Sequence, residues 1–464
     1  MEGNLKKGLM VVFSANIVNL VFNLLTNFLL PKYLSVDSYS AIKTFQLYTT
    51  YIGIFGLGAA DGMYLRYGGE QLNRVDESVL ETGIFSFRIL MILESIILIP
   101  FSFVLRDKII IAFTLTILST NMSSYFKNLY QAVGEFDRYG RILNITTIAT
   151  FAVNMVLLFV LGTDEYFLYL VGYVIVDAVI WFILEYNFHS LMKGGVYSGH
   201  TSFSVKLIVE DIKSGFLLMV GNFSNILLSS MDRWFVKVMM DTAQFAYYSF
   251  TVSLEGFLNV AISPITTTLY NYFCSHKEYD DVVRIRKSVL IFGTVIVAAA
   301  FPAKFIIQVW LQNYTGAVNV LFILFSTQMI YAVIKGVYVN LYKAVKKQNL
   351  YFLRLVSILI IGAVINFVFV NIYFVKEAFA YGTLVSAVIW LLFSIHDFRE
   401  YVFSFREGAC LVLEIFLFNA FGMYFNAILG LVLYVICTIS LLLILMREEK
   451  MQLLNAVKKV LKFR

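Results

Sequence analysis

The segment Asn128-Leu-Tyr-Gln-Ala-Val133 recurs as Asn340-Leu-Tyr-Lys-Ala-Val345, with five of its six residues unchanged. Each copy ends a long apolar run, and a short basic loop follows it. A match this short in so apolar a chain needs independent support before it indicates a duplication. The halves of the chain share a second correspondence.

A polar stripe supplies this second correspondence. Four side chains in the first apolar run follow one another at steps of three, four and four residues, which places them on one face of a helix. The seventh apolar run repeats these steps 206 positions later, whereas the quoted segments lie 212 positions apart, so the halves differ by a small insertion. The two stripes are Asn16, Asn19, Asn23 and Asn27, and Asn222, Asn225, Ser229 and Arg233.

The composition places the chain in a membrane. Hydrophobic residues make up 60% of it, charged residues only 14%, and its mean hydropathy is +0.79, values typical of a protein whose solvent is the bilayer. At ~20 apolar residues per helix, the sequence predicts an all-α polytopic membrane protein with about fourteen transmembrane helices. The predicted spans are 8–30, 41–62, 83–105, 108–130, 141–162, 166–187, 215–238, 244–270, 288–311, 317–341, 351–375, 378–396, 408–426 and 428–446.

Lysine and arginine concentrate in the loops that follow even-numbered spans and in both termini. Short loops rich in these residues stay cytoplasmic, so we expect both termini to be cytoplasmic. The net charge of +6 reflects this bias, and we do not expect nucleic-acid binding. The first span is too long for the apolar part of a cleaved signal and lacks a small-residue cleavage pattern, so we expect a retained helix.

The duplication predicts two parallel six-helix lobes, because spans 1 and 7 then run in the same direction. We expect a short interfacial helix at 205–212, within the linker between the lobes. The three cysteines form no CxxC motif and the four histidines lie in or beside loops, so the sequence does not indicate a metal site. The sequence also has no glycine-rich phosphate-binding motif that would indicate a nucleotide site. We therefore expect no cofactor. The predicted parts are an N-lobe 1–187, a linker 188–214, a C-lobe 215–396, two further spans in 397–446 and a basic tail 447–464.

Three stretches resemble one known family. They are Phe28-Leu-Leu-Pro-Lys-Tyr-Leu-Ser-Val-Asp-Ser-Tyr39, Leu57-Gly-Ala-Ala-Asp-Gly-Met-Tyr-Leu-Arg-Tyr-Gly68 and Met231-Asp-Arg-Trp-Phe235. Together with the topology, they resemble the Wzx-type polysaccharide or O-antigen flippases of the multidrug/oligosaccharidyl-lipid/polysaccharide exporter superfamily, whose fold is MATE-like. The resemblance implies a non-enzymatic protein of the bacterial inner membrane. It would move an undecaprenyl-diphosphate-linked glycan by alternating access, alongside a glycan polymerase and other proteins of the same pathway.

A lipid-diphosphate sugar needs cations for its phosphates and amides for its hydroxyls. A charge near a helix centre costs roughly 2.5–3.5 kcal/mol, so such charges usually face a cavity or a partner. Arg88 and Lys335 could instead extend to the cytoplasmic interface, and asparagines could cement helix packing. The candidate substrate-binding residues are Arg233, which extends the second polar stripe, Arg88, Lys335, Lys304, Asn16, Asn19, Asn23, Asn222 and Asn225.

Carboxylates at membrane depth are candidates for coupling transport to a proton or a sodium ion. Glu255 ranks first, because no base lies within four positions of it on its own helix; Glu94 and Asp177 follow. The alternative is structural pairing, for example of Glu94 with Arg88. Asp61 and Arg66 form a helix-end motif of the family, or simply an interfacial pair at a glycine-rich stop.

Two other functions remain open. A drug or organic-cation antiporter of the same superfamily would favour a lumen of carboxylates and aromatic rings, whereas bases are at least as frequent here. A membrane glycan polymerase or ligase would be expected to have a long external loop, and every predicted external loop is short. The residues do not distinguish a polysaccharide repeat unit from a peptidoglycan precursor as cargo.

Overall fold

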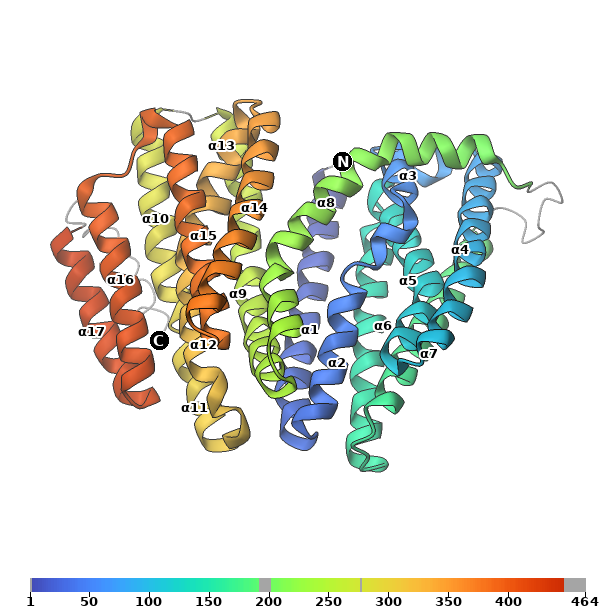
Figure 1. The fold of residues 1–464 in the computed structure, drawn as a ribbon. Coiled ribbons are helices and arrows are strands. Elements are labelled where there is room, and N and C mark those ends of the chain that lie inside the picture. The colour runs from blue at the N-terminus through green and yellow to red at the C-terminus, as the bar shows by residue number, and fades with distance from the viewer. Residues whose placement is uncertain (1, 192–201, 276–277, 446–464) are drawn as a thin grey trace. The chain divides into compact units, whose positions relative to one another are not determined.

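The computed structural model describes residues 2–191, 202–275 and 278–445 (Figure 1). These residues are almost entirely helical and contain no β-strand, which confirms the all-α membrane fold. Within the described ranges, twelve helices are long and apolar enough to cross a membrane. The chain divides into two compact units, unit 1 (residues 1–230) and unit 2 (residues 231–464). The predicted basic tail and residues 192–201 of the predicted linker lie outside the described residues.

The two halves of the chain order their helices alike. α8 (Val205–Met239) stands in the second half where α1 stands in the first. The first half comprises α1 (Glu2–Tyr33), α2 (Val36–Thr49), α3 (Ala59–Tyr67), α4 (Glu77–Leu105), α5 (Lys108–Ala132), α6 (Phe136–Met155) and α7 (Tyr166–Leu191). The second continues with α9 (Thr242–Ser275), α10 (Tyr279–Val297), α11 (Ala300–Trp310), α12 (Val318–Val333), α13 (Val339–Ala344), α14 (Gln348–Ile372), α15 (Lys376–Asp397), α16 (Phe405–Tyr424) and α17 (Ala427–Leu445).

Many of these helices begin at a polar side chain that satisfies their free amides. Asp76 accepts from two amides at the start of α4, Asp107 does so at α5, and Ser404 forms a capping box with Glu407 at α16. Asp241 accepts from the Gln244 amide at the start of α9, and this hydrogen bond lowers the pKa of the Asp241 carboxyl. Short loops with capped helix starts therefore fix where several of the spans begin.

Two of the fourteen predicted spans fall outside the set of twelve. The predicted span 244–270 is the single helix α9, whose 34 residues extend about 50 Å and are long enough to cross a bilayer. The predicted span 41–62 is broken into α2, the 3-10 turn η1 (Ile52–Gly56) and α3. The break lies at Leu57 and Gly58, whose φ angles of 50° and 85° are left-handed and cannot continue a helix.

The duplicated segments fold into the same helix end. In each copy the last valine, Val133 or Val345, closes the helix, and the next residue, Gly134 or Lys346, has a positive φ of 77° or 58°. The second residue after each valine then donates its amide to the tyrosine carbonyl of the segment at 2.8 Å, as in a Schellman motif. The sequence repeat is thus a repeat of backbone geometry.

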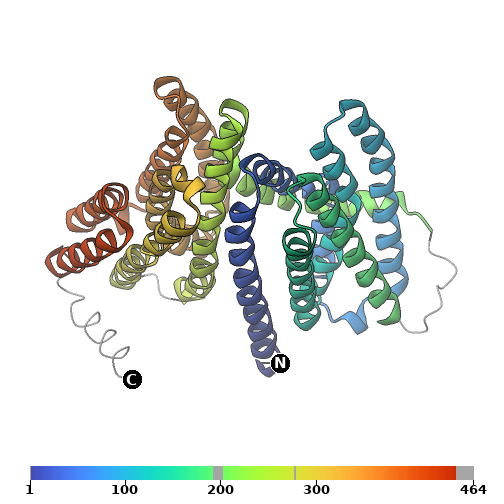
Figure 2. The same cartoon turned by 90° about the horizontal axis from the view of Figure 1, so that it is seen from below.

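Each unit is built around one buried helix. In unit 1, α5 packs against α3, α4 and α7, and in unit 2, α12 packs against α9, α10, α15 and α16. Nearly all of α12 is buried, including the polar side chains of Ser326, Thr327 and Gln328. At the side of unit 1, α1 lies along α6 (Figure 2).

α8 is continuous from Val205 to Met239, so the expected short helix at 205–212 is part of the longer helix. Its first turns cross α3 at glycines. A Cβ added to Gly62 would clash with the backbone of Asp211, and one added to Gly215 would clash with Gly58 and Gly62. These glycines let the two backbones touch.

Two buried cations hold the last two helices, α16 and α17, against the rest of unit 2. Figure 2 shows α16 and α17 as an adjacent pair. Arg286 on α10 forms an ion pair of 2.7 Å with Glu407, and their side chains are only 1% and 2% exposed. Lys304 on α11 donates to the backbone carbonyls of Gly422 and Phe425, at the turn between α16 and α17. Each cation thus ties the pair to the six-helix lobe.

Candidate functional site

Three of the sequence-predicted residues come together in unit 2. Glu255 on α9 accepts a hydrogen bond from Gln328 on α12. Lys335 donates to Asn259, one turn along α9, at 3.1 Å. The charges of Arg233, Lys335 and Asp232 all act on the Glu255 carboxylate. We call Glu255, Arg233, Lys335 and Asp232 the unit 2 cluster.

A local irregularity positions Lys335. It lies in the π-helical turn η5 (Ile334–Tyr338), between α12 and α13, and wide turns of this kind often occur at functional sites. The ammonium group sits 5.0 Å from the centre of the Tyr331 ring, which in turn packs edge-on against Trp390. An aromatic face can stabilise a cation where water is scarce.

Asp232 is a member of this cluster that the sequence analysis did not identify as a site residue. It is buried, with 7% of its surface exposed, and accepts hydrogen bonds from the Tyr248 hydroxyl at 2.6 Å and the Thr383 hydroxyl at 3.5 Å. These partners come from α9 and α15, distant in sequence, so only the charge of Asp232 within a span hinted at its role.

Arg233 holds the least satisfied cation of the cluster. Its Nε is buried and has no hydrogen-bond partner among the described residues. The carboxylate of the neighbouring Asp232 accepts a hydrogen bond from the Arg233 backbone amide at 2.7 Å, and not from the Arg233 guanidinium group. The structure therefore leaves a buried donor of Arg233 available for an anion.

Unit 1 contains a polar pocket of about 190 Å³ at the break between α2 and α3. The Asn121 amide stabilises the break by donating to the Ile52 carbonyl at 3.2 Å. The Asn222 amide crosses to Asp61 at 3.3 Å, so the second polar stripe reaches this pocket. Its polar lining consists of Thr50, Tyr51, Asp61, Asn121, Ser124, Asn128 and Asn222.

The remaining stripe asparagines have varied surroundings. Asn23 donates to Asn19, and Asn16 is exposed. Asn225 donates to the Gly221 carbonyl of its own helix at 3.0 Å. Asn27, at the end of the first stripe, accepts at 2.8 Å from the buried base Lys43.

Several other predicted residues lie outside the unit 2 cluster. Arg88 forms an ion pair with Glu185 on α7, so the alternative pairing with Glu94 is not what the structure shows. Asp177 accepts from Thr120 at 3.0 Å, and Glu94 has one carboxylate oxygen that is buried without a partner in the described chain. Lys304 binds the carbonyls described above.

Asp61 and Arg66 both contact α8. Asp61 accepts from Asn222, and Arg66 donates to Asp211 from two nitrogens at 2.7 and 2.9 Å, with Glu210 3.6 Å away. The helix-end motif therefore fastens α3 to α8 instead of pairing with itself. No group of three or more His, Cys, Asp or Glu side chains able to hold a metal occurs in the described part of the chain.

No family model matches the sequence, and no curated protein matches it either. By structure, the chain is similar to the lipid II flippase MurJ in an inward closed conformation, with a TM-score of 0.70 and 13% identity over 96% of this chain and 99% of MurJ. It is also similar to the eukaryotic MATE transporter AtDTX14, with a TM-score of 0.54 and 11% identity over 89% of this chain and 97% of that one. A third similar structure is a mutant of the Vibrio cholerae MATE transporter VcmN, with a TM-score of 0.51 and 14% identity over 86% of this chain and 98% of that one.

These similarities define the fold. It is the fold shared by MurJ and the MATE transporters. The expected MATE-like architecture, with two lobes of six helices and two additional C-terminal helices, is confirmed. Sequence identities this low support a shared fold but do not indicate which substrate is transported.

Proposed function

We propose that the chain is a flippase that moves an undecaprenyl-diphosphate-linked oligosaccharide, the repeat unit of an O-antigen, capsule or exopolysaccharide, across the bacterial inner membrane by alternating access. The observation that carries this proposal is the buried Nε of Arg233, which has no partner among the described residues. A buried guanidinium donor costs free energy unless an acceptor arrives, and a diphosphate is the acceptor that its planar fork fits best.

Further groups in each unit, each unit taken by itself, support an anionic, sugar-bearing cargo. Lys335 adds a second base to the same cluster, next to the aromatic ring of Tyr331. The unit 1 pocket offers amides and hydroxyls, the groups that hydrogen-bond sugar hydroxyls. MurJ, which has this fold, is named a flippase of a lipid-linked substrate, lipid II.

Movement of an anionic headgroup without a nucleotide site requires an ion gradient or the membrane potential. We assign the coupling to a proton on Glu255, with a sodium ion as the alternative. Glu255 suits this role because Gln328 is its hydrogen-bond partner and both Arg233 and Lys335 act on it, so cargo binding to these bases changes the field at the carboxylate. Glu94 and Asp177 are the next candidates.

The competing proposal is a drug or organic-cation antiporter. The MATE similarity favours it, as do two carboxylates near aromatic rings, those of the buried Asp232 and the half-buried Glu255. The two functions require opposite charges on the cargo, because Arg233 would repel a cation. Cargo charge therefore separates them.

The test is transport in proteoliposomes that contain the purified protein. We expect a fluorescent lipid-diphosphate oligosaccharide to cross the membrane, Arg233→Ala to lower its rate at least tenfold, and Arg233→Lys to restore only part, because the bidentate fork is lost. The matched control is Lys237→Ala, which removes a cation one turn further along α8 that lies over the Phe245 ring. Transport of an organic cation with no movement of the glycan would overturn the proposal, and equal rates for Arg233→Ala and the parent would overturn the role of Arg233.

Reporter fusions test the proposed orientation. Both termini should be cytoplasmic, so alkaline phosphatase fused to the C-terminus should be inactive. An active fusion would contradict an even number of crossings.

A further inference from the structure

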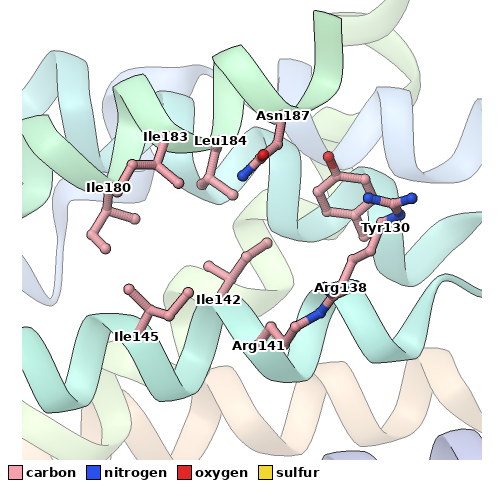
Figure 3. Close-up of a pocket in the computed structure, with 9 residues that line it drawn as sticks. All are labelled: Tyr130, Arg138, Arg141, Ile142, Ile145, Ile180, Ile183, Leu184 and Asn187. Atoms are coloured by element: carbon pink, nitrogen blue, oxygen red, sulfur yellow. The ribbon is translucent and has the colours of Figure 1, made fainter. Parts of the chain in front are cut away.

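A second pocket, of about 130 Å³, lies in unit 1 at the end of the duplicated segment. It is formed by the last turn of α5, the first turns of α6 and the last turns of α7, and Figure 3 shows its polar side chains gathered at one end and its aliphatic side chains at the other. The polar end holds Tyr130, Arg138, Arg141 and Asn187, and the aliphatic end holds Ile142, Ile145, Ile180, Ile183 and Leu184.

The polar end is cationic. Arg138 forms a 3.2 Å pair with Glu135 through its Nε, and Arg141 uses its Nε to donate to the Asp137 carbonyl at 3.2 Å. The charges of both arginines and of Glu135 act on the Tyr130 hydroxyl. No carboxylate lines the pocket within the part of the chain that is described. Of the two arginines, only Arg138 has a carboxylate partner among the described residues, and that carboxylate, Glu135, lies outside the pocket.

The equivalent place in unit 2 shows what such a site binds. There Tyr342, the counterpart of Tyr130, donates to Asp397 at 2.5 Å, and Arg354 on the second turn of α14 donates to both oxygens of the same carboxylate at 2.6 and 2.7 Å. Asp397 is the last residue of α15, and the corresponding last turns of α7 carry the neutral Asn187. Unit 2 thus supplies its own anion, and unit 1 does not.

We propose that the pocket of unit 1 binds the phosphate of an anionic phospholipid in place of the missing carboxylate. The phosphate accepts from Arg141, Arg138 and the Tyr130 hydroxyl, as Asp397 accepts from Arg354 and Tyr342. An acyl chain lies along the aliphatic end, where Ile145 is 45% and Ile183 is 39% exposed.

A phospholipid fits better than the proposed cargo because the aliphatic end has no group that could hydrogen-bond a sugar. Basic pockets between helices at the cytoplasmic face commonly bind anionic headgroups. The proposal uses the cytoplasmic orientation proposed above for the loop that carries Arg138 and Arg141, and it does not depend on which cargo is transported.

The test is native mass spectrometry of the purified, delipidated full chain with added dioleoyl phosphatidylglycerol, dioleoyl phosphatidylcholine, undecaprenyl phosphate or inorganic phosphate. We expect one phosphatidylglycerol per chain to bind at least tenfold more tightly than phosphatidylcholine. Arg141→Gln should weaken this binding about tenfold. Asn187→Asp, which adds the carboxylate that unit 2 has, should weaken it at least as much while the protein remains folded, because the arginines then have an internal partner.

Four results would overturn the proposal. The first is equal binding of both phospholipids, and the second is parent-like phosphatidylglycerol binding by both single variants, Asn187→Asp and Arg141→Gln. The third is tighter binding of undecaprenyl phosphate than of phosphatidylglycerol. The fourth is displacement of the bound phosphatidylglycerol by equimolar inorganic phosphate. The third would assign the pocket to the cargo, and the fourth to a free anion. A thermal unfolding scan of each variant shows whether lost binding reflects lost fold, and Ser288→Ala, a substitution on the exposed surface of unit 2, serves as the neutral control.

Discussion

In unit 2, Tyr342 and Arg354 share the carboxylate of Asp397, whereas in unit 1 Tyr130 lines a pocket with two arginines and the neutral Asn187. The backbones that present these side chains end in the same hydrogen bonds. Duplication therefore preserved the scaffold, and the loss or gain of one carboxylate decides whether the site is closed by the protein or open to an external anion.

Within the membrane spans the difference is reversed, because the internally paired cation lies in unit 1 and the cation without an ion pair in the described chain lies in unit 2. In unit 1, Arg88 is paired directly with Glu185. In unit 2, Arg233 and Lys335 act on Glu255 without a direct ion pair among the described residues. The Nε atoms of Arg88 and Arg233 are both buried without a partner there, so the ion pair of Arg88 is what distinguishes the two arginines. A cation closed by its own lobe stabilises the fold, whereas an incompletely satisfied one is available to a cargo.

Removal of the carboxylate in unit 2 should give the largest effect. Asp397→Asn removes the negative charge and one of the two acceptor oxygens that Arg354 and Tyr342 use in a largely buried site. It should lower the free energy of unfolding by about 3 kcal/mol, the lower end of the range for breaking a buried pair, because the Arg354 side chain is 22% exposed. Unfolding in detergent measures this effect. Asn187→Asp in unit 1 is the reciprocal variant and should not destabilise. Equal stability of Asp397→Asn and the parent would show that the contacts of Asp397 with Arg354 and Tyr342 contribute nothing to the free energy of unfolding.

The glycine crossing of unit 1 should give the next largest effect. Gly62→Ala forces α3 away from Asp211 and should cost about 2 kcal/mol as overpacking. The matched control lies on α9, the unbroken counterpart helix, where a Cβ on Gly256 meets nothing within 4 Å. Gly256→Ala should stabilise by up to about 1 kcal/mol through helix propensity. Thermal unfolding of the two variants in parallel compares them, and a Gly62→Ala protein as stable as Gly256→Ala would refute the close crossing.

The two helix ends should give the smallest effect. Gly134→Ala places a Cβ at a φ of 77° and should destabilise by about 1 kcal/mol, whereas Lys346→Gly removes a side chain from the same left-handed geometry and should stabilise by about the same amount. Opposite shifts of the unfolding temperature are the expected sign. Shifts in the same direction would mean that the two ends are not equivalent.

Much of the fold was predictable because helix spans and repeats are local patterns. Hydrophobic runs predicted about fourteen spans, and twelve helices in the described part of the chain are long and apolar enough to cross a membrane. The segments at Asn128 and Asn340 predicted a duplication, and both copies fold into the same helix end. The broken span was missed because apolar length hides backbone conformation. Leu57 takes a left-handed φ that its residue type does not suggest, and only the three glycines around it hinted at a break.

The candidate site was predictable in part. Arg233, Lys335 and Glu255 were identified individually because charge inside a span is costly, and that argument holds for each residue alone. Their proximity depends on how α8, α9 and α12 pack, which the sequence does not specify. For the same reason the alternative considered for Arg88 was a pair with Glu94 on its own helix, whereas packing pairs Arg88 with Glu185 on α7.

The most direct test of transport through the unit 2 cluster is the response of glycan flipping to an imposed pH gradient. In proteoliposomes with a fluorescent lipid-diphosphate oligosaccharide, a gradient should accelerate the parent protein. Glu255→Gln should remove the acceleration while cargo binding remains, because an amide cannot carry the proton. Acceleration that persists in Glu255→Gln but is lost in Glu94→Gln would contradict the account and place the coupling in unit 1.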